Sequence, residues 1–133
     1  MSLAREAIAA RAMGQIGTPF RLHGRTPDVA MDCVGLVAHA IDCHKAPKNY
    51  SLKGMQLSEI VSYMDNIGLS PLCDSVDICN GDVAVVASSP RQFHLMVRAA
   101  NGWVHSHAGL RKVVHSPGAS PWPIVAVRRM IGN

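Results

Sequence analysis

The sequence predicts an α+β fold in which N-terminal helices pack on a C-terminal antiparallel β-sheet. Two observations lead to this class. Apolar residues recur at helical spacing up to about residue 64, and the remainder reads as short strand-like runs separated by glycine, proline, serine and asparagine. The 133 residues contain no internal repeat, linker or low-complexity tract. We therefore expect one domain with one core, spanning residues 1–133.

Three helices account for the first half. An alanine-rich segment from Leu3 carries apolar residues at helical intervals, and Gly17 and Pro19 end it. After a turn-rich stretch, a second helix begins at Cys33 and shows an apolar stripe of period 3.6. Asp32 precedes it, where a carboxylate suits the free N–H groups and the positive end of the helix dipole. A third helix fits the spacing of Leu57, Ile60, Val61 and Met64.

The second half predicts an antiparallel sheet. Its segments are rich in β-branched residues and are bounded by turn formers, which is typical of strands joined by hairpins. The five predicted strands cover residues 82–87, 93–99, 102–107, 110–114 and 123–130.

Composition excludes several classes of protein. Hydrophobic residues make up 48% and charged residues 17%, as in ordinary globular domains. The formal net charge is +4, but the thirteen Lys and Arg are scattered and aromatic residues amount to only 5%. Neither a phosphate-tracking stripe nor a stacking platform is present, so we expect no nucleic-acid partner.

The sequence also predicts no membrane partner and no cofactor. No apolar run reaches the ~18 residues of a membrane span, and the first twenty residues lack the order of a secretory signal. We therefore expect synthesis in the cytoplasm without a signal peptide. The four cysteines show no CxxC spacing, which favours free thiols over a zinc ribbon, and we expect no metal.

Cys33 is the candidate nucleophile. Free N–H groups and the dipole at a helix N-terminus favour an anion, so we expect the pKa of Cys33 to be lowered. The same N–H groups can stabilise the oxyanion that forms when a thiolate attacks a carbonyl. A small buried cysteine is the alternative interpretation, and it is the one that we favour for Cys43, Cys73 and Cys79.

A thiolate that cleaves an amide needs a proton donor, and histidine is suited because its pKa lies near neutrality. His94 near the start of one predicted strand and His105 near the end of the next lie at the same edge of a hairpin. His94 would then act as base and His105 would orient it.

The hairpin register decides whether these two rings can meet. A tight turn centred on Asn101-Gly102 would separate His94 from His105 by about 13 Å along the strand. We therefore predict a four-residue loop over residues 98–101 or a bulge. His107 points the same way as His105 and competes for its role, and together the two could instead chelate zinc.

These residues resemble the NlpC/P60 cysteine peptidases, especially the short forms carried by phages and prophages. The similarity runs from about Gly17 to Val114 and combines "DC-x-G-L" with a histidine about sixty residues later and another polar residue about a dozen after that. It implies a papain-like fold and the peptide bonds of peptidoglycan as substrate, typically between D-glutamate and a diamino acid. It assigns Cys33 as nucleophile, His94 as base, His105 as third polar residue and Asp32 as acidic neighbour.

Two positions depart from the family pattern. Phe20 stands where the family usually has tyrosine, and Val34 stands where it usually has the serine that follows the nucleophile. Both are candidate substrate-binding positions, together with Asp32 and with His23 in the loop that borders the site. Asp32 could equally serve as a helix cap alone.

The sequence thus predicts a thiol hydrolase that cleaves peptidoglycan stem peptides through a thioester. One alternative is a weak or inactive structural component of a phage tail tip, with phage tail proteins as partners. Another is an amidase or acyltransferase acting on an amide outside the cell wall. A wall enzyme without a signal would reach its substrate in a phage particle or by release to the wall.

Overall fold

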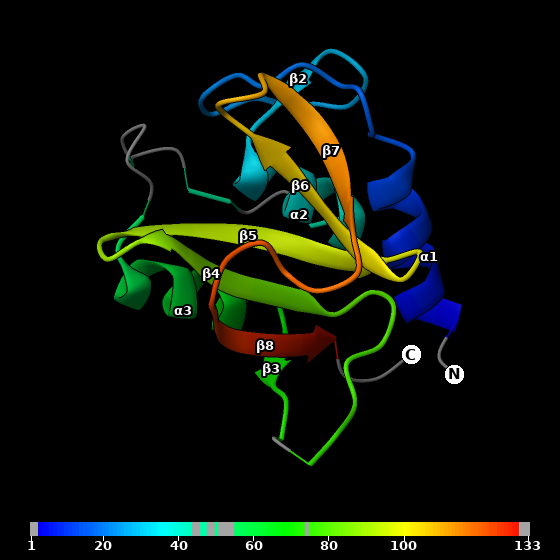
Figure 1. Cartoon of the computed structure of the whole chain (residues 1–133), viewed down its shortest axis with the longest axis vertical. Coiled ribbons are helices and arrows are strands. Elements are labelled where there is room, and N and C mark those ends of the chain that lie inside the picture. Colours follow the sequence, from blue (N-terminus) through cyan, green and yellow to red (C-terminus); the bar gives the residue numbers. More distant parts are fainter. Residues whose placement is uncertain (1–2, 44–45, 48–49, 51–54, 74, 131–133) are drawn as a thin grey trace.

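The computed structural model describes residues 3–43, 46–47, 50, 55–73 and 75–130. Three helices and a six-stranded antiparallel sheet form the molecule, with a separate two-stranded ribbon in the turn-rich stretch (Figure 1). The predicted α+β class is therefore confirmed. The elements are α1 Leu3–Met13, β1 Arg25–Thr26, β2 Ala30–Met31, α2 Cys33–Ile41, α3 Leu57–Asn66, β3 Leu69–Pro71, β4 Val83–Ser89, β5 Gln92–Ala99, β6 Gly102–His107, β7 Lys112–Pro117 and β8 Ile124–Met130.

The strand order is β3-β8-β4-β5-β6-β7, with every neighbouring pair antiparallel. The five predicted strands correspond to β4 to β8, although β7 starts two residues later than predicted. β3 was not predicted, because a three-residue strand ending in proline shows no periodicity of its own. It is stable as an edge strand because β8 supplies the hydrogen-bonding partner.

The sheet separates two apolar clusters, because side chains alternate between its faces. On the helical face, Leu95 and Val97 of β5 pack with the buried residues of all three helices. On the opposite face, Met96 packs with Trp103 of β6 and with Trp122 from the connection between β7 and β8. A side chain of β5 or β6 therefore belongs either to the α2 face or to the Trp122 face.

The β5–β6 hairpin is short and opens widely. Its register pairs Ala99 with Gly102 and Val97 with Val104, and the ladder ends there. Beyond that point the β6–β7 ribbon turns away from β4, β5 and β8 (Figure 1). The parts of β5 and β6 that carry the histidines are therefore not paired with each other.

Gly81 and Asp82 fix the entry to β4. Gly81 has a φ of +88°, and a Cβ built on it would lie 2.3 Å from the Arg5 carbonyl oxygen. The fully buried Asp82 carboxylate accepts hydrogen bonds from Nε and Nη2 of Arg129, both at 2.8 Å, and from the Cys79 N–H. These two residues are therefore structural.

Gly35 brings α2 into close contact with the loop that precedes β1. A Cβ at Gly35 would lie 2.1 Å from the Gly24 carbonyl oxygen. We expect Gly35→Ala to lower the free energy of unfolding by about 1–3 kcal/mol, although alanine favours helix, because the loop must move. Urea denaturation measures this.

Gly14→Ala is the matched control. Its Cβ would meet carbonyl oxygens only at 3.5 Å, which is ordinary contact, so stability should be unchanged or slightly higher. Equal stability of the two variants would show that the approach of α2 to the loop is not tight.

Candidate active site

Cys33 is the first residue of α2, and Asp32 is its N-cap. The Asp32 side chain accepts a hydrogen bond from the Gly35 N–H at 2.8 Å, so the predicted capping role is confirmed. Cys33 is partly exposed and packs on the helical face of the sheet. The local sequence therefore places a thiol at a helix N-terminus, as the spacing predicts.

Asp32 is only 3% exposed and joins the loops that surround Cys33. Its carboxylate accepts from Arg25 Nη1 at 2.8 Å, from the His23 N–H at 2.9 Å and from the Tyr50 hydroxyl. Arg25 Nη2 also donates to the Tyr50 hydroxyl at 2.8 Å. Both oxygens of Asp32 are engaged inside the protein.

The pKa of Cys33 is raised to about 12, and the expectation of a lowered pKa is wrong. Burial of the sulfur is the main cause, and the negative charge of Asp32 adds to it. A backbone hydrogen bond from Leu95 and the positive charge of Arg25 oppose the rise without cancelling it. In this arrangement the thiol is protonated at neutral pH.

The surroundings of the thiol explain this pKa. A cavity of only about 20 Å³ adjoins the sulfur, and its walls are apolar apart from Tyr50. They consist of Cys33, Val34, Tyr50, Met55, Ile60, Phe93 and Leu95.

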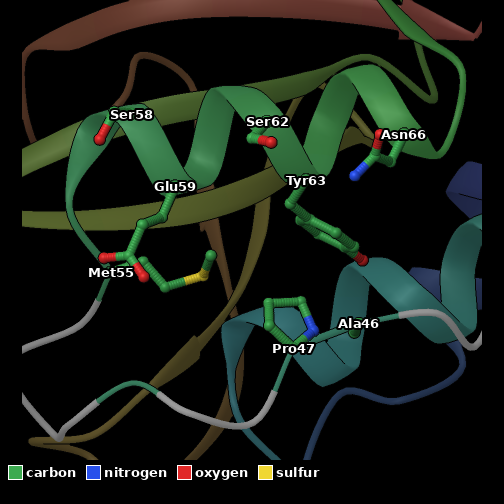
Figure 2. A pocket seen from close by; sticks show the side chains of 8 residues that line it. All are labelled: Ala46, Pro47, Met55, Ser58, Glu59, Ser62, Tyr63 and Asn66. Carbon is green, nitrogen blue, oxygen red and sulfur yellow. The ribbon is translucent and has the colours of Figure 1, made fainter.

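Met55 also borders a larger cavity of about 440 Å³ (Figure 2). In Figure 2 this cavity lies between α3 and the segment that carries Ala46 and Pro47, with Glu59, Ser62 and Tyr63 reaching into it from the helix. Met55 is therefore the wall that the two cavities share.

The candidate histidines His94, His105 and His107 gather on the face of the sheet opposite α2. Trp122 lies in their midst, with its ring centroid 5.5 Å from that of His94, 5.3 Å from that of His105 and 5.7 Å from that of His107. Among the residues that the structure describes, no hydrogen bond joins Cys33 to an imidazole. The structure thus brings the candidate histidines together, but away from the thiol.

The hairpin register explains the partner of His94. The turn consists of Ala100 and Asn101, both with positive φ, so neither the longer loop nor an Asn101-Gly102 turn forms. Gly102 is needed in β6, because a Cβ there would lie 2.3 Å from the Ser116 carbonyl oxygen. Extended along the strands, this register sets His94 against His107 rather than His105.

Burial governs the protonation of these rings. The pKa of His105 is lowered to about 4, mainly by desolvation and further by the neighbouring His107, His94 and His115. The pKa of His94 is lowered by desolvation and by His107. His105 Nε2 lies 2.9 Å from Ser116 Oγ, and His107 Nδ1 accepts from the Leu110 N–H at 3.0 Å.

A cavity of about 230 Å³ opens beside this cluster. Its walls come from β4, β5, β6, the loop after β6 and the connection that carries Trp122. The lining residues are Ser88, Gln92, His94, Ser106, His107, Ala108, Gly109 and Trp122.

The predicted substrate-binding residues occupy different places. Val34 lines the cavity of Cys33. His23 supports that cavity from behind, since its Nε2 lies 2.6 Å from the Tyr50 carbonyl oxygen and its ring meets the Tyr50 ring edge-on. Phe20 lies where the loop meets the start of β7, with its N–H donating to the Arg111 carbonyl.

Sequence reasoning missed two residues of this region. Tyr50 stands in a stretch without periodicity, and no sequence signal connects it to Asp32. Trp122 carries no sequence signal of a functional site, and only the fold places it among the histidines. Within the described residues, no group of three or more His, Cys, Asp or Glu is arranged to hold a metal ion, and no helix is long and apolar enough to cross a membrane.

Comparison with known proteins rests on structure alone, since no family model and no curated protein sequence matches the chain. NlpC1 from Trichomonas vaginalis superposes with a TM-score of 0.70 at 20% identity, covering 95% of this chain and 44% of that protein. The peptidoglycan hydrolase RipB from Mycobacterium tuberculosis gives 0.63 at 20% identity, covering 98% and 66%. RipD from the same organism, a non-catalytic NlpC/p60 domain protein, gives 0.64 at 15% identity, covering 98% and 100%.

A cysteine that opens a helix packed on an antiparallel sheet defines the papain-like class of α+β domains. Within that class, the superpositions show that this chain has the NlpC/P60 fold. The chain spans less than half the length of NlpC1.

The raised pKa predicts slow alkylation of Cys33. At pH 8 an ordinary exposed thiol is about one quarter thiolate, whereas a thiol with a pKa near 12 is about 0.01% thiolate. We expect iodoacetamide to label the exposed Cys73 at least about a hundredfold faster than Cys33. Peptide mass spectrometry of timed samples measures both rates.

Met55→Ala tests the role of the shared wall. Opening it should hydrate the sulfur and accelerate labelling of Cys33, whereas Met13→Ala on α1 should not. Faster labelling of Cys33 than of Cys73 in the unaltered protein would contradict a raised pKa of Cys33.

Trp122 keeps the imidazoles out of water, so Trp122→Ala should raise the pKa values of His94 and His105 towards 6.5. Because these pKa values are lowered in the folded state, protonation opposes folding. The free energy of unfolding should therefore fall as the pH drops from 6.5 towards 4, less steeply in the variant. NMR titration of the histidine Cε1–H signals and urea denaturation measure the two effects.

His39 on α2 provides the internal control, since its signal should be unaffected by the substitution. Unchanged titration of His94 and His105 in Trp122→Ala would show that Trp122 does not shield them.

Proposed function

We propose that this chain is a cysteine peptidase that hydrolyses amide bonds in peptidoglycan stem peptides, of the type between D-glutamate and a diamino acid. The position of Cys33 carries the proposal. Cys33 is the first residue of α2, and its sulfur accepts a backbone hydrogen bond from Leu95, the residue next to His94 on β5. The NlpC/P60 fold, which this chain shares with the peptidoglycan hydrolase RipB, supports the choice of substrate.

The reaction proceeds through a thioester. His94 takes the proton of the Cys33 thiol, and the sulfur attacks the amide carbonyl. N–H groups at the start of α2 stabilise the oxyanion. His94 returns the proton to the leaving amine and then activates water, which releases the acid and restores the thiol. His105, whose Nε2 lies at Ser116 Oγ in this structure, would orient the ring of His94 from the neighbouring strand.

This cycle requires a rearrangement. In the structure His94 stacks on Trp122 and the thiol is protonated. His94 must leave Trp122 and turn through the opening between β5 and β6, where the ladder is absent. Substrate that displaces Met55 would hydrate the thiol at the same time.

The second candidate is a non-catalytic domain that binds peptidoglycan. The specific observation in its favour is the placement of Cys33 and the imidazoles on opposite faces of the sheet. RipD, described as a non-catalytic NlpC/p60 domain protein adapted to a peptidoglycan-binding function, shares the fold.

Digestion of purified sacculi separates the two candidates. The peptidase should release soluble peptides that mass spectrometry assigns to one cleaved bond, and Cys33→Ser and His94→Gln should each lower release by at least about a hundredfold. Sedimentation of Cys33→Ser with intact sacculi measures binding in parallel.

Binding without release by the unaltered protein would establish the non-catalytic candidate. Release that persists in Cys33→Ser would overturn the thiol mechanism.

A further inference from the structure

The histidine cavity on the Trp122 face has a chemical character of its own. His94, His107 and Trp122, which line the cavity, carry ring N–H groups, and Gln92 adds an amide, while the Ser88 hydroxyl already donates to the Gln92 carbonyl at 3.4 Å. Because Nδ1 of His107 accepts the Leu110 N–H, the proton of the neutral ring lies on Nε2. The walls thus offer several hydrogen-bond donors.

None of the described residues that line this cavity is acidic. The nearby titratable groups are further imidazoles, namely His105 beside His107 on β6 and His115 on β7. The two buried carboxylates Asp32 and Asp82 are committed elsewhere, since Asp32 pairs with Arg25 and Asp82 with Arg129, and the exposed Asp65 pairs with Arg128. A cluster of imidazoles therefore lacks a counter-charge.

An anion in the cavity would supply it. Desolvation and mutual repulsion keep the pKa values of His94 and His105 low, and both effects weaken when a negative charge lies beside the rings. At about 230 Å³ the cavity is smaller than the usual 300–1,000 Å³ of a ligand pocket, so it fits one terminal group and not a whole ligand.

We propose that this cavity binds the free carboxylate of a peptide and that an imidazole of the cluster takes up a proton on binding. The choice of a peptide rests on the proposed function, because peptidoglycan stem peptides carry free carboxylates. Nε2 of His107 and the Trp122 indole N–H donate to the carboxylate. The bound peptide lies at the opening between β5 and β6.

The test uses Cys33→Ser protein, so that no turnover occurs. N-acetyl-D-alanine and its uncharged amide are titrated at pH 7.5 and 5.5 and followed through the histidine Cε1–H signals. The carboxylate should shift His94 and His107 and leave His39 on α2 unmoved. The Kd of the carboxylate should fall by up to about tenfold for each unit by which the pH is lowered, since binding takes up a proton. The amide should not bind.

Two further arms complete the design. His107→Gln, which keeps a donor but no titratable ring, should weaken carboxylate binding by about fivefold or more. Inorganic phosphate should shift the same signals more weakly than the carboxylate. Equal binding of acid and amide, a Kd independent of pH, stronger binding of phosphate, or unchanged affinity in His107→Gln would each overturn the proposal.

The outcome is independent of sacculus digestion. If the carboxylate binds but the unaltered protein does not cleave sacculi, the proposed peptidase activity is overturned and the proposed carboxylate site stands. If the protein cleaves sacculi but does not bind the carboxylate, the peptidase activity stands and the carboxylate site is overturned.

Discussion

The carboxylate of Asp32 is the interaction on which this region depends. It caps α2 through Gly35 and holds Arg25 and His23 of the preceding loop together with Tyr50 from a more distant part of the sequence. The same charge lies next to Cys33 and raises the pKa of its thiol. One group therefore orders the loops and also disfavours the thiolate. A charged ligand or a displaced loop near Asp32 would change both together.

The second constraint is the alternation of side chains along β5. Leu95 faces α2 and contacts Cys33, so its neighbour His94 must face the other side as long as the strand is regular. The ladder with β4 keeps the strand regular at this point, since it pairs Val86 with His94 and Val85 with Leu95, although β5 and β6 separate after three pairs. The separation of the thiol from the imidazole thus follows from the alternation of side chains along β5, and not from the absence of either residue.

The sequence was sufficient for the fold class, the helix that begins at Cys33 and the capping role of Asp32, since each follows from local spacing and helix chemistry. Strand positions were also predicted, because turn formers bound them. The hairpin register was not, since it depends on Gly102 packing against Ser116 of the next strand. Nor was the pKa of Cys33, because burial by Val34 and Phe93 is a property of the assembled core. The contacts of Tyr50 and Trp122 likewise arise only in three dimensions.

The position of Met55 between two cavities has a mechanical consequence. Methionine is unbranched and changes its rotamer at little cost. A ligand in the wide cavity beside α3 therefore meets a flexible side chain at the boundary to the cavity of Cys33. A ligand that displaces the Met55 side chain in the wide cavity would therefore change the shape of the small cavity beside Cys33. Substitution of Met55 would therefore change how the wide cavity affects the small cavity beside Cys33, while the helices and the sheet stay in place.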